Sequence, residues 1–457
     1  MQTRPAFKQE RVFRQAHWLA TSSLVTLGRH TLTGMLAAGG RQFEDWSCAY
    51  RLFSQERIDR QALFAPAIKG VSEQLGDDEP MVVLMDDTLV RKRGRKVAGA
   101  GWKRDPLGPP FQTNLVWGQR YLQLSAALPD RQVLGRARAV PIDFIHTPCP
   151  QRPHKTAPAE DWQAFREQQA HMKLSAVAAR RFHALRGQVP DKRLLCSVDG
   201  GYTNSAMFRA IPDNSVLIGR IRKDARLFSV PADEGMRRGR KRYYGKPLPT
   251  PQQIRQDESI PWQQVEAYAA GKRHVFDVKT VAPLRWRGSG ARDVRLVVIR
   301  PLAYRPSKGV KLLYRDPAYL ICSDVNLPLD MLLQAYLWRW EIEVNFRDEK
   351  TVLGIGEAQV RLPSSVENLP ALLVAAFAFL LLADAAAHPH CFPSPKWYPR
   401  NPTDRPSAQH LLALFRSQLW HLAIPPIKTN FALSPPLSPN YFFSPNSIAS
   451  AICYAFK

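Results

Sequence analysis

Two short, mostly apolar runs constrain the fold of this chain more than any other feature. They are Met81 to Met85 and Leu194 to Val198, and such runs are typical of central strands in a sheet that is covered on both faces. Between them the pattern predicts strands within 111–117 and 121–128, a hairpin turn at Gly118-Gln119-Arg120 and a helix over 162–185. This order predicts an α/β fold with a mixed sheet.

The rest of the chain divides into further units. Residues 1–75 are predicted to form three helices, at 17–36, from about 44 and from about 57. This unit is either a DNA-binding domain or a dimerisation domain. The arginines that could contact DNA are Arg11, Arg14, Arg29, Arg41, Arg51 and Arg57. The sheet domain is expected to span 76–204 and 326–384, with one long helix over 329–353. An all-β insertion at 205–325 is predicted from strand patterns at 216–221, 274–280, 294–299 and 319–322. Residues 385–457 form a proline-rich tail with one expected helix.

Charge indicates the kind of partner. The chain has 64 Lys and Arg against 39 Asp and Glu, a net charge of +25, which indicates a polyanion such as nucleic acid or an anionic membrane. The longest apolar run, Leu369 to Ala383, is shorter than the roughly 20 residues of a membrane span and predicts a buried helix. Six scattered cysteines without a Cys-x-x-Cys pair favour a reducing cytoplasm. We therefore expect a cytoplasmic protein that binds DNA and no membrane.

Acidic residues follow the two apolar runs directly. Asp86 and Asp87 come after the first, and Asp199 comes after the second. Either site alone is compatible with an ordinary turn or cap. Neighbouring strands lie about 5 Å apart, so two such sites on adjacent strands bring carboxylates together. Carboxylate oxygens are the ligands that Mg²⁺ and Mn²⁺ prefer.

The expected long helix carries a third candidate acid. At about 100° per residue, one arc of roughly 60° holds Tyr336, Arg339, Glu343 and Lys350, with Arg347 beside it. Glu341 and Glu349 fall off this face. The face is compatible with a solvated surface carrying pairs such as Glu343–Arg347, worth a few tenths of a kcal/mol. We favour the alternative, a metal-binding carboxylate among cations that contact phosphates.

The spacing of these residues resembles motifs of a known protein family. The spacing Tyr336-x2-Arg339-x3-Glu343-x6-Lys350 resembles the Tyr-Arg-Glu-Lys signature of one branch of bacterial insertion-sequence DDE transposases. Asp86-Asp87-Thr88 resembles the first-acid motif of that family, and Val198 to Tyr202 resembles the second. The resemblance covers about 78–384. It implies an RNase H-like fold and a catalytic triad of Asp86, Asp199 and Glu343 that binds two Mg²⁺ or Mn²⁺ ions.

The resemblance also implies an activity and partners. The implied activity is two-metal strand cleavage by water, followed by strand transfer from the freed 3′-OH, at the ends of the element that encodes the protein. The partners are double-stranded DNA, as element ends and target, and a second copy on paired ends. Tyr336, Arg339, Arg347 and Lys350 would contact the element end, and Tyr319 would stack on a flipped base. Adjacent strand residues face opposite ways, so Asp87 remains the alternative first acid.

Two basic segments complete the predicted DNA interface. They contain Arg91, Lys92, Arg93, Arg95 and Lys96, and Arg237, Arg238, Arg240, Lys241 and Arg242. Two other functions stay open. One is a non-catalytic, domesticated transposase that only binds DNA, which the presence of all three acids argues against. The other is a nuclease or resolvase on the same scaffold, which the Tyr-Arg-Glu-Lys signature argues against.

Overall fold

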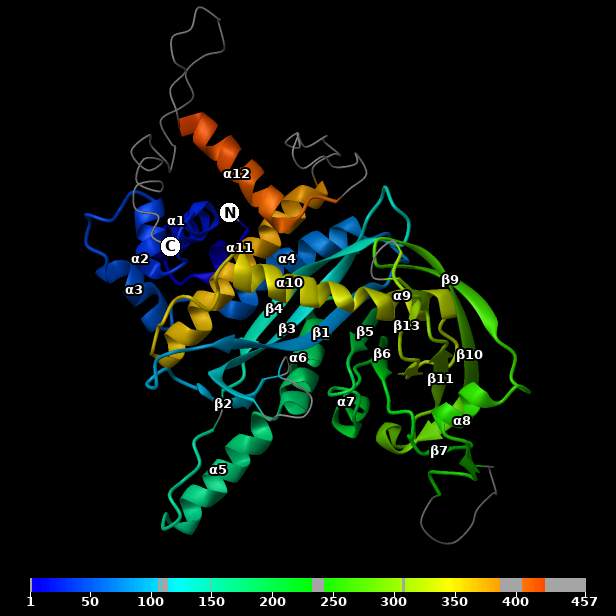
Figure 1. The fold of residues 1–457 in the computed structure, drawn as a ribbon. Coiled ribbons are helices and arrows are strands. Elements are labelled where there is room, and N and C mark those ends of the chain that lie inside the picture. The colour runs from blue at the N-terminus through cyan, green and yellow to red at the C-terminus, as the bar shows by residue number, and fades with distance from the viewer. Residues whose placement is uncertain are drawn as a thin grey trace, which may run out of the picture.

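The centre of the molecule is a mixed sheet. A computed structural model describes residues 2–105, 108, 114–148, 150–231, 242–305, 309–386 and 405–423. Five strands lie in the order β4-β3-β1-β5-β6: β4 (Ala137–His146), β3 (Leu115–Pro129), β1 (Met81–Arg91), β5 (Leu194–Val198) and β6 (Ser215–Arg220). The first two pairings in this order are antiparallel and the last two are parallel. This mixed sheet is compatible with the predicted RNase H-like fold (Figure 1).

The strands of 205–325 extend this sheet. Beyond β6 it continues through β14 (Ala318–Cys322), β11 (Val294–Ile299), β10 (Lys272–Trp286), β7 (Leu227–Phe228) and β8 (Pro247–Leu248). At its margins β9 (Gln263–Ala269) pairs with β10, and β2 (Gly101–Arg104) pairs with β3. The prediction of an all-β insertion is wrong in one respect, because the segment also contains helices α7 (Ser205–Arg209) and α8 (Pro251–Gln256).

The predicted hairpin at Gly118-Gln119-Arg120 is wrong. These residues lie inside β3, which pairs with β1 without interruption from Gly118 to Ala127. A side chain at Gly118 would place its Cβ 2.6 Å from the carbonyl oxygen of Val90, so the glycine permits close strand approach and makes no turn. Strand β4 was not predicted, because Pro141 interrupts its pattern. That proline lies at an irregularity in the β3–β4 pairing, where strands tolerate proline.

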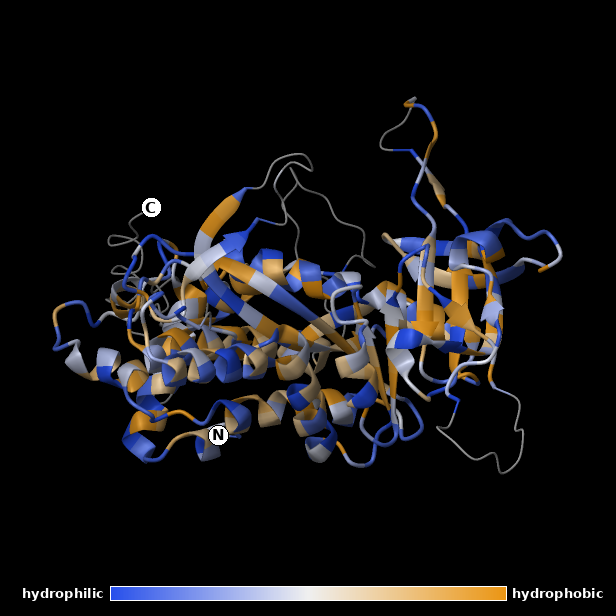
Figure 2. Ribbon diagram, turned by 90° about the horizontal axis from the view of Figure 1, so that it is seen from below, coloured by the Kyte–Doolittle hydropathy of each residue, from blue (hydrophilic) through white to orange (hydrophobic). Residues whose placement is uncertain are grey.

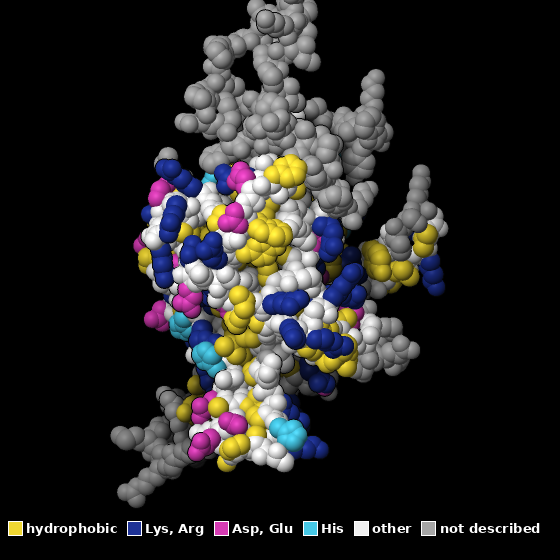
Figure 3. Space-filling view, turned by 90° about the vertical axis from the view of Figure 1, so that its left-hand side faces the viewer, with side chains coloured by type: hydrophobic (Ala, Val, Ile, Leu, Met, Phe, Trp, Pro, Cys, Tyr) yellow, Lys and Arg dark blue, Asp and Glu magenta, His cyan; other side chains and the backbone are white. Residues whose placement is uncertain are grey.

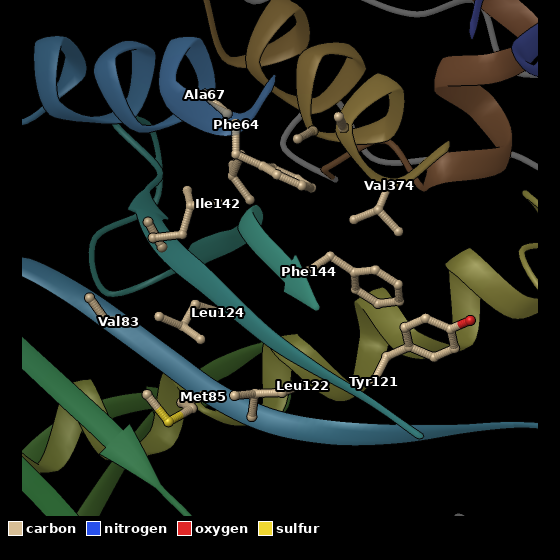
Figure 4. Packing of buried hydrophobic residues seen from close by; sticks show 14 of the residues in the cluster. Phe64, Ala67, Val83, Met85, Tyr121, Leu122, Leu124, Ile142, Phe144 and Val374 are labelled. Carbon is tan, nitrogen blue, oxygen red and sulfur yellow. The ribbon is translucent and has the colours of Figure 1, made fainter. Parts of the chain in front are cut away.

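Helices cover both faces of the sheet. One face packs against α4 (Arg60–Gln74), α6 (Leu174–Gln188) and α11 (Pro363–Ala386). Helices α1 (Glu10–Val25), α2 (Leu32–Ala38) and α3 (Ser47–Ser54) add to the same core, and α1 and α3 pack against α11. In Figure 4, Phe64 of α4 and Val374 of α11 point toward Phe144 of β4, whose ring stacks on Tyr121 with centroids 4.8 Å apart. Two predicted helices divide: 17–36 lies across α1 and α2, and 162–185 divides into α5 (Ala159–His171) and α6. The expected C-terminal helix is α12 (Ala408–Ala423).

Helix α11 is confirmed as a buried helix. It is the one helix in the described ranges that is long and apolar enough to cross a membrane, and 72% of its apolar window is buried. It packs against β4 and α4. Figure 2 shows apolar colouring along this central layer of helices and strands.

The opposite face of the sheet packs against α9 (Leu329–Trp338) and α10 (Trp340–Thr351). The single helix predicted over 329–353 therefore divides at Arg339. The backbone of Arg339 keeps helical angles, φ −51° and ψ −31°, while its N–H bonds to the carbonyl of Tyr336, three residues back. Because the backbone stays helical through the break, the residues of the predicted face keep a common side.

Candidate active site

Asp86 and Asp199 lie close together where β1 extends beyond the end of its parallel neighbour β5. The pairing of β1 with β5 ends at Met85 and Val198, and the chain leaves β5 at Asp199. Asp86 and Asp87 were expected after a strand but lie within β1, opposite Gln123 and Leu122 of β3. The Oδ1 of Asp199 accepts hydrogen bonds from the N–H groups of Gly201 (2.8 Å) and Tyr202 (3.2 Å). This turn fixes the Asp199 carboxylate beside β1.

Asp86 is held in a buried, negatively charged environment. Burial, reinforced by the charge of Asp199, raises the pKa of Asp86 to about 7, while the Arg339 guanidinium opposes that rise. Its Oδ1 accepts the N–H of Asp87 at 2.8 Å. A carboxylate in this setting gains from a nearby cation, because opposite charge favours the ionised form.

Arg339 links Asp86 to Glu343. One guanidinium nitrogen lies 3.0 Å from Asp86 Oδ2 and another lies 3.1 Å from Glu343 Oε1. The Arg339 side chain is 16% exposed and that of Glu343 is 37% exposed. Within the described ranges, no three His, Cys, Asp or Glu side chains are close enough together to hold a metal ion as they stand. The guanidinium therefore supplies the positive charge between these two acids.

Asp87 faces a different set of partners. Its Oδ1 accepts the hydroxyl of Tyr202 at 2.6 Å, and its Oδ2 lies 3.3 Å from Nε of Arg120. Burial raises the pKa of Asp87, against the Tyr202 hydrogen bond and the Arg120 charge. Sequence reasoning assigned no role to Tyr202 and placed Arg120 in a turn. The geometry favours Asp86, and not Asp87, as the partner of Glu343.

The other residues of the predicted helical face lie near the acids or on the surface. Tyr336 interacts with Arg339, and burial raises its pKa. Lys350 is exposed on α10, where its charge interacts with Asp87 and Asp105. Arg347 is exposed and pairs with Asp348 at 2.9 Å, so the Glu343–Arg347 pair considered from the sequence does not form. Glu341 pairs with Arg405 (2.9 Å), away from the acids.

A basic cavity of about 880 Å³ opens beside Asp199. Its lining includes four cations (Arg220, Arg222, Lys223 and Arg255), two acids (Asp224 and Asp316), and Gly200, Thr203, Trp286 and Tyr319. Tyr319, the predicted base-stacking residue, is buried in β14 at 4% exposure. Trp286 is half-buried and contacts Phe208 edge to face. No local sequence pattern indicates Trp286 or the basic lining, because these residues come from separate strands and loops.

The two predicted basic segments have different outcomes. In the first, Arg91, Arg93, Arg95 and Lys96 are exposed, and the Arg95 guanidinium lies over the rings of Trp102 and Trp117. Lys92 is buried and donates hydrogen bonds to the backbone carbonyls of Gly356 and Ala358. It therefore holds the segment 356–358 in place and does not reach the surface. In the second, Arg242 is exposed, while Arg237, Arg238, Arg240 and Lys241 lie outside the described residues.

One buried carboxyl lies behind the site. Glu349 of α10 is fully buried, and neither of its carboxyl oxygens has a hydrogen-bond partner among the described residues. Burial raises the pKa of Glu349 to about 8, with the neighbouring Gln123 side chain opposing that rise. Because burial disfavours the charged form of a carboxyl group, Glu349 is best described as a neutral acid.

Comparison with known proteins shows the family to which the chain belongs. A family model described as DDE superfamily endonuclease matches residues 4–289. The chain therefore belongs to the DDE superfamily endonuclease family, whose nucleases typically use divalent metal ions. The match includes Asp86 and Asp199 and ends before α10, which carries Glu343. No curated protein matches the chain.

Proposed function

We propose that this protein is a DNA transposase that cleaves and joins strands at the ends of its own insertion sequence. One observation carries the proposal: Asp86 beside Asp199, joined through Arg339 to Glu343. These acids come from β1, the end of β5 and α10, three elements that are distant in the sequence. Their convergence at one edge of the sheet supports a catalytic triad.

Divalent ions suit these acids in chemical type. All three side chains offer hard carboxylate oxygens, and Asp86 is short of positive charge because burial and Asp199 together raise its pKa. Mg²⁺ or Mn²⁺ bound by Asp86, Asp199 and Glu343 would activate a water and stabilise the leaving oxygen in phosphoryl transfer. Arg339 contacts one oxygen of each carboxylate, Oδ2 of Asp86 and Oε1 of Glu343. An ion that takes either of these oxygens would displace the guanidinium from it.

The remaining polar side chains position the DNA. Lys350, Arg347 and a released Arg339 would contact phosphates, which fixes register without reading sequence. Tyr336 would orient Arg339 through their interaction. The cavity beside Asp199 is basic enough to receive a nucleotide next to the cleaved bond. Trp286 exposes more ring than Tyr319 there and is the better candidate for stacking. A homodimer on paired ends, located in the cytoplasm, completes the proposal.

The test is strand cleavage of DNA that carries the flanks of the gene, with Mg²⁺ or Mn²⁺ present. Glu343→Gln keeps the size of the side chain and removes its charge. Glu341→Gln is the matched control on the same helix, because Glu341 pairs with Arg405 away from the acids. We expect the wild type and Glu341→Gln to cut at the element ends and Glu343→Gln to bind without cutting.

Three other outcomes would change the proposal. Equal cutting by Glu343→Gln would remove that residue from the site. Cutting without joining to a target would favour the nuclease or resolvase alternative. Binding without cutting by the wild type would favour the non-catalytic alternative.

A further inference from the structure

A small β hairpin stands apart from the main sheet. Strands β12 (Ala303–Tyr304) and β13 (Leu313–Tyr314) pair only with each other in the described residues, as Ala303 with Tyr314 and Tyr304 with Leu313. The N–H of Arg315 donates to the carbonyl of Leu302 (3.1 Å) at the base of the hairpin. In Figure 2 the hairpin projects from the β-rich side of the molecule, at the upper right.

Apolar side chains on this hairpin are exposed. Every described residue from Ala303 to Asp316 is exposed, including Tyr314 at 66%, Leu313 at 39% and Tyr304 at 38%. A two-stranded hairpin is only marginally stable alone in water, and exposed apolar groups that gather in one place mark interaction sites. The hairpin therefore has the character of an arm that binds a partner.

The charges of the arm indicate that its partner is a polyanion. Its described cations are Arg305, Lys311 and Arg315, and its described acid is Asp316, at the base. The Arg315 guanidinium lies over the ring of Tyr304, 5.2 Å from the ring centroid. A positive charge and an aromatic surface are therefore next to each other on the arm. A second copy of a chain with net charge +25 would repel such an arm, whereas a polyanion attracts it. The major groove of DNA is wide enough for a two-stranded β ribbon.

The place of the arm connects it to the site. Asp316 and Pro317, where β13 leads into β14, line the same cavity as Gly200 and Arg220. Gly200 directly follows Asp199. DNA with its scissile bond at the acids would therefore pass close to the base of the arm.

We propose that the β12–β13 hairpin is a DNA-binding arm that contacts the duplex next to the cleaved bond. This inference rests on the proposed function, because it takes DNA as the substrate. Arg305, Lys311 and Arg315 would contact phosphates, and Tyr304 and Tyr314 would pack against sugars or bases.

The test compares two triple variants of the full-length protein. Arg305→Gln with Lys311→Gln and Arg315→Gln removes three charges, while Arg305→Lys with Lys311→Arg and Arg315→Lys keeps them. Affinity for a duplex carrying the gene's flank is measured by fluorescence anisotropy between 50 and 300 mM KCl. Each phosphate contact contributes about 0.9 to the slope of log affinity against log salt. We expect the Gln variant to lose roughly 2 to 3 from this slope and to bind at least tenfold more weakly at 100 mM salt, and the charge-keeping variant to resemble wild type.

The outcomes separate this inference from the proposed function. Equal slopes for the two variants, with wild type still cutting flank DNA, would overturn the arm and leave the transposase proposal standing. Equal slopes together with a lower oligomeric mass for the Gln variant would assign the arm to a second protein chain. A weaker, flatter salt response in the Gln variant supports the arm even if wild type binds DNA without cutting it. Thermal melting of both variants checks that the fold is unchanged.

Discussion

Helix α10 carries two glutamates in opposite surroundings. Glu343 lies near the start of the helix, partly exposed, and pairs with Arg339 at the edge of the sheet. Glu349 lies six residues on, fully buried against β3, and its oxygens have no hydrogen-bond partner in the part of the chain that the structure describes. Glu343 pairs with a guanidinium and is partly open to solvent, which favours its charged form. Glu349 is enclosed in the core, and burial favours its protonated form.

The same contrast separates the neighbours Asp86 and Asp87. Asp86 shares Arg339 with Glu343, whereas Asp87 bonds to Tyr202 and lies near Arg120. Asp86 and Glu343 therefore share one guanidinium, while the Asp87 carboxylate is held by a hydroxyl and a second arginine.

Substitution of Asp86 is expected to change the rate of strand cleavage more than any other substitution considered, and much more than substitution of Asp87. Asp86→Asn should reduce strand cleavage on the order of a thousand-fold, because a catalytic ion is worth several kcal/mol. Asp87→Asn should reduce it about tenfold, through a disturbed Tyr202 hydrogen bond. Rates of single-turnover cleavage measure both. If Asp87→Asn proves the more severe change, Asp87 is the first acid.

The next effect concerns stability and pH at Glu349. Its pKa is about 8 in the folded protein and about 4.3 in an unfolded chain. The folded state thus holds a proton that the unfolded state releases, and the free energy of unfolding falls as pH rises from about 4 to 8. Glu349→Gln cannot ionise, so it should be more stable than wild type at pH 8, by on the order of a few kcal/mol.

Denaturant unfolding of wild type and Glu349→Gln at pH 5 and pH 8 measures this difference. Glu341→Gln serves again as the control, because Glu341 already has an arginine partner. Parallel pH profiles for wild type and Glu349→Gln would show that Glu349 is ionised in the folded protein.

The smallest expected effect on strand cleavage is that of removing the Tyr202 hydroxyl. Tyr202→Phe removes the hydroxyl that donates to Asp87. We expect a loss of about 1 to 3 kcal/mol in the free energy of unfolding, since a buried carboxylate loses a partner. Cleavage should fall only a few-fold. A fall as large as that of Asp86→Asn would place Tyr202 among the catalytic residues.

Much of the fold followed from pattern. Strands β1, β5 and β6, the buried α11 and the strand-rich 205–325 segment were predictable, because continuous apolar runs report burial on both sides. Strand β4 was not, since Pro141 breaks its pattern, and the hairpin at Gly118 was wrong, because a glycine there serves close packing. The break between α9 and α10 had no sequence signal, as no glycine or proline lies at Arg339.

The candidate site divides in the same way. Spacing along one helix placed Tyr336, Arg339 and Glu343 on a common side, which depends only on helical geometry. It also placed Glu349 off that side, but periodicity does not say whether the other side meets solvent or core. Tyr202, Arg120 and Trp286 reach their positions through contacts between distant strands. Such contacts leave no local pattern.

If Asp86, Asp199 and Glu343 together bind divalent ions, removing one of the three carboxylates weakens metal binding. The most direct measurement is Mn²⁺ titration of the full-length protein without DNA, followed by electron paramagnetic resonance of free Mn²⁺. Asp199→Asn is the informative variant, because its amide oxygen can still accept the N–H groups of Gly201 and Tyr202. We expect tight Mn²⁺ binding by wild type and at least tenfold weaker binding by Asp199→Asn. Equal binding by the two proteins would show that Asp199 is not a metal ligand.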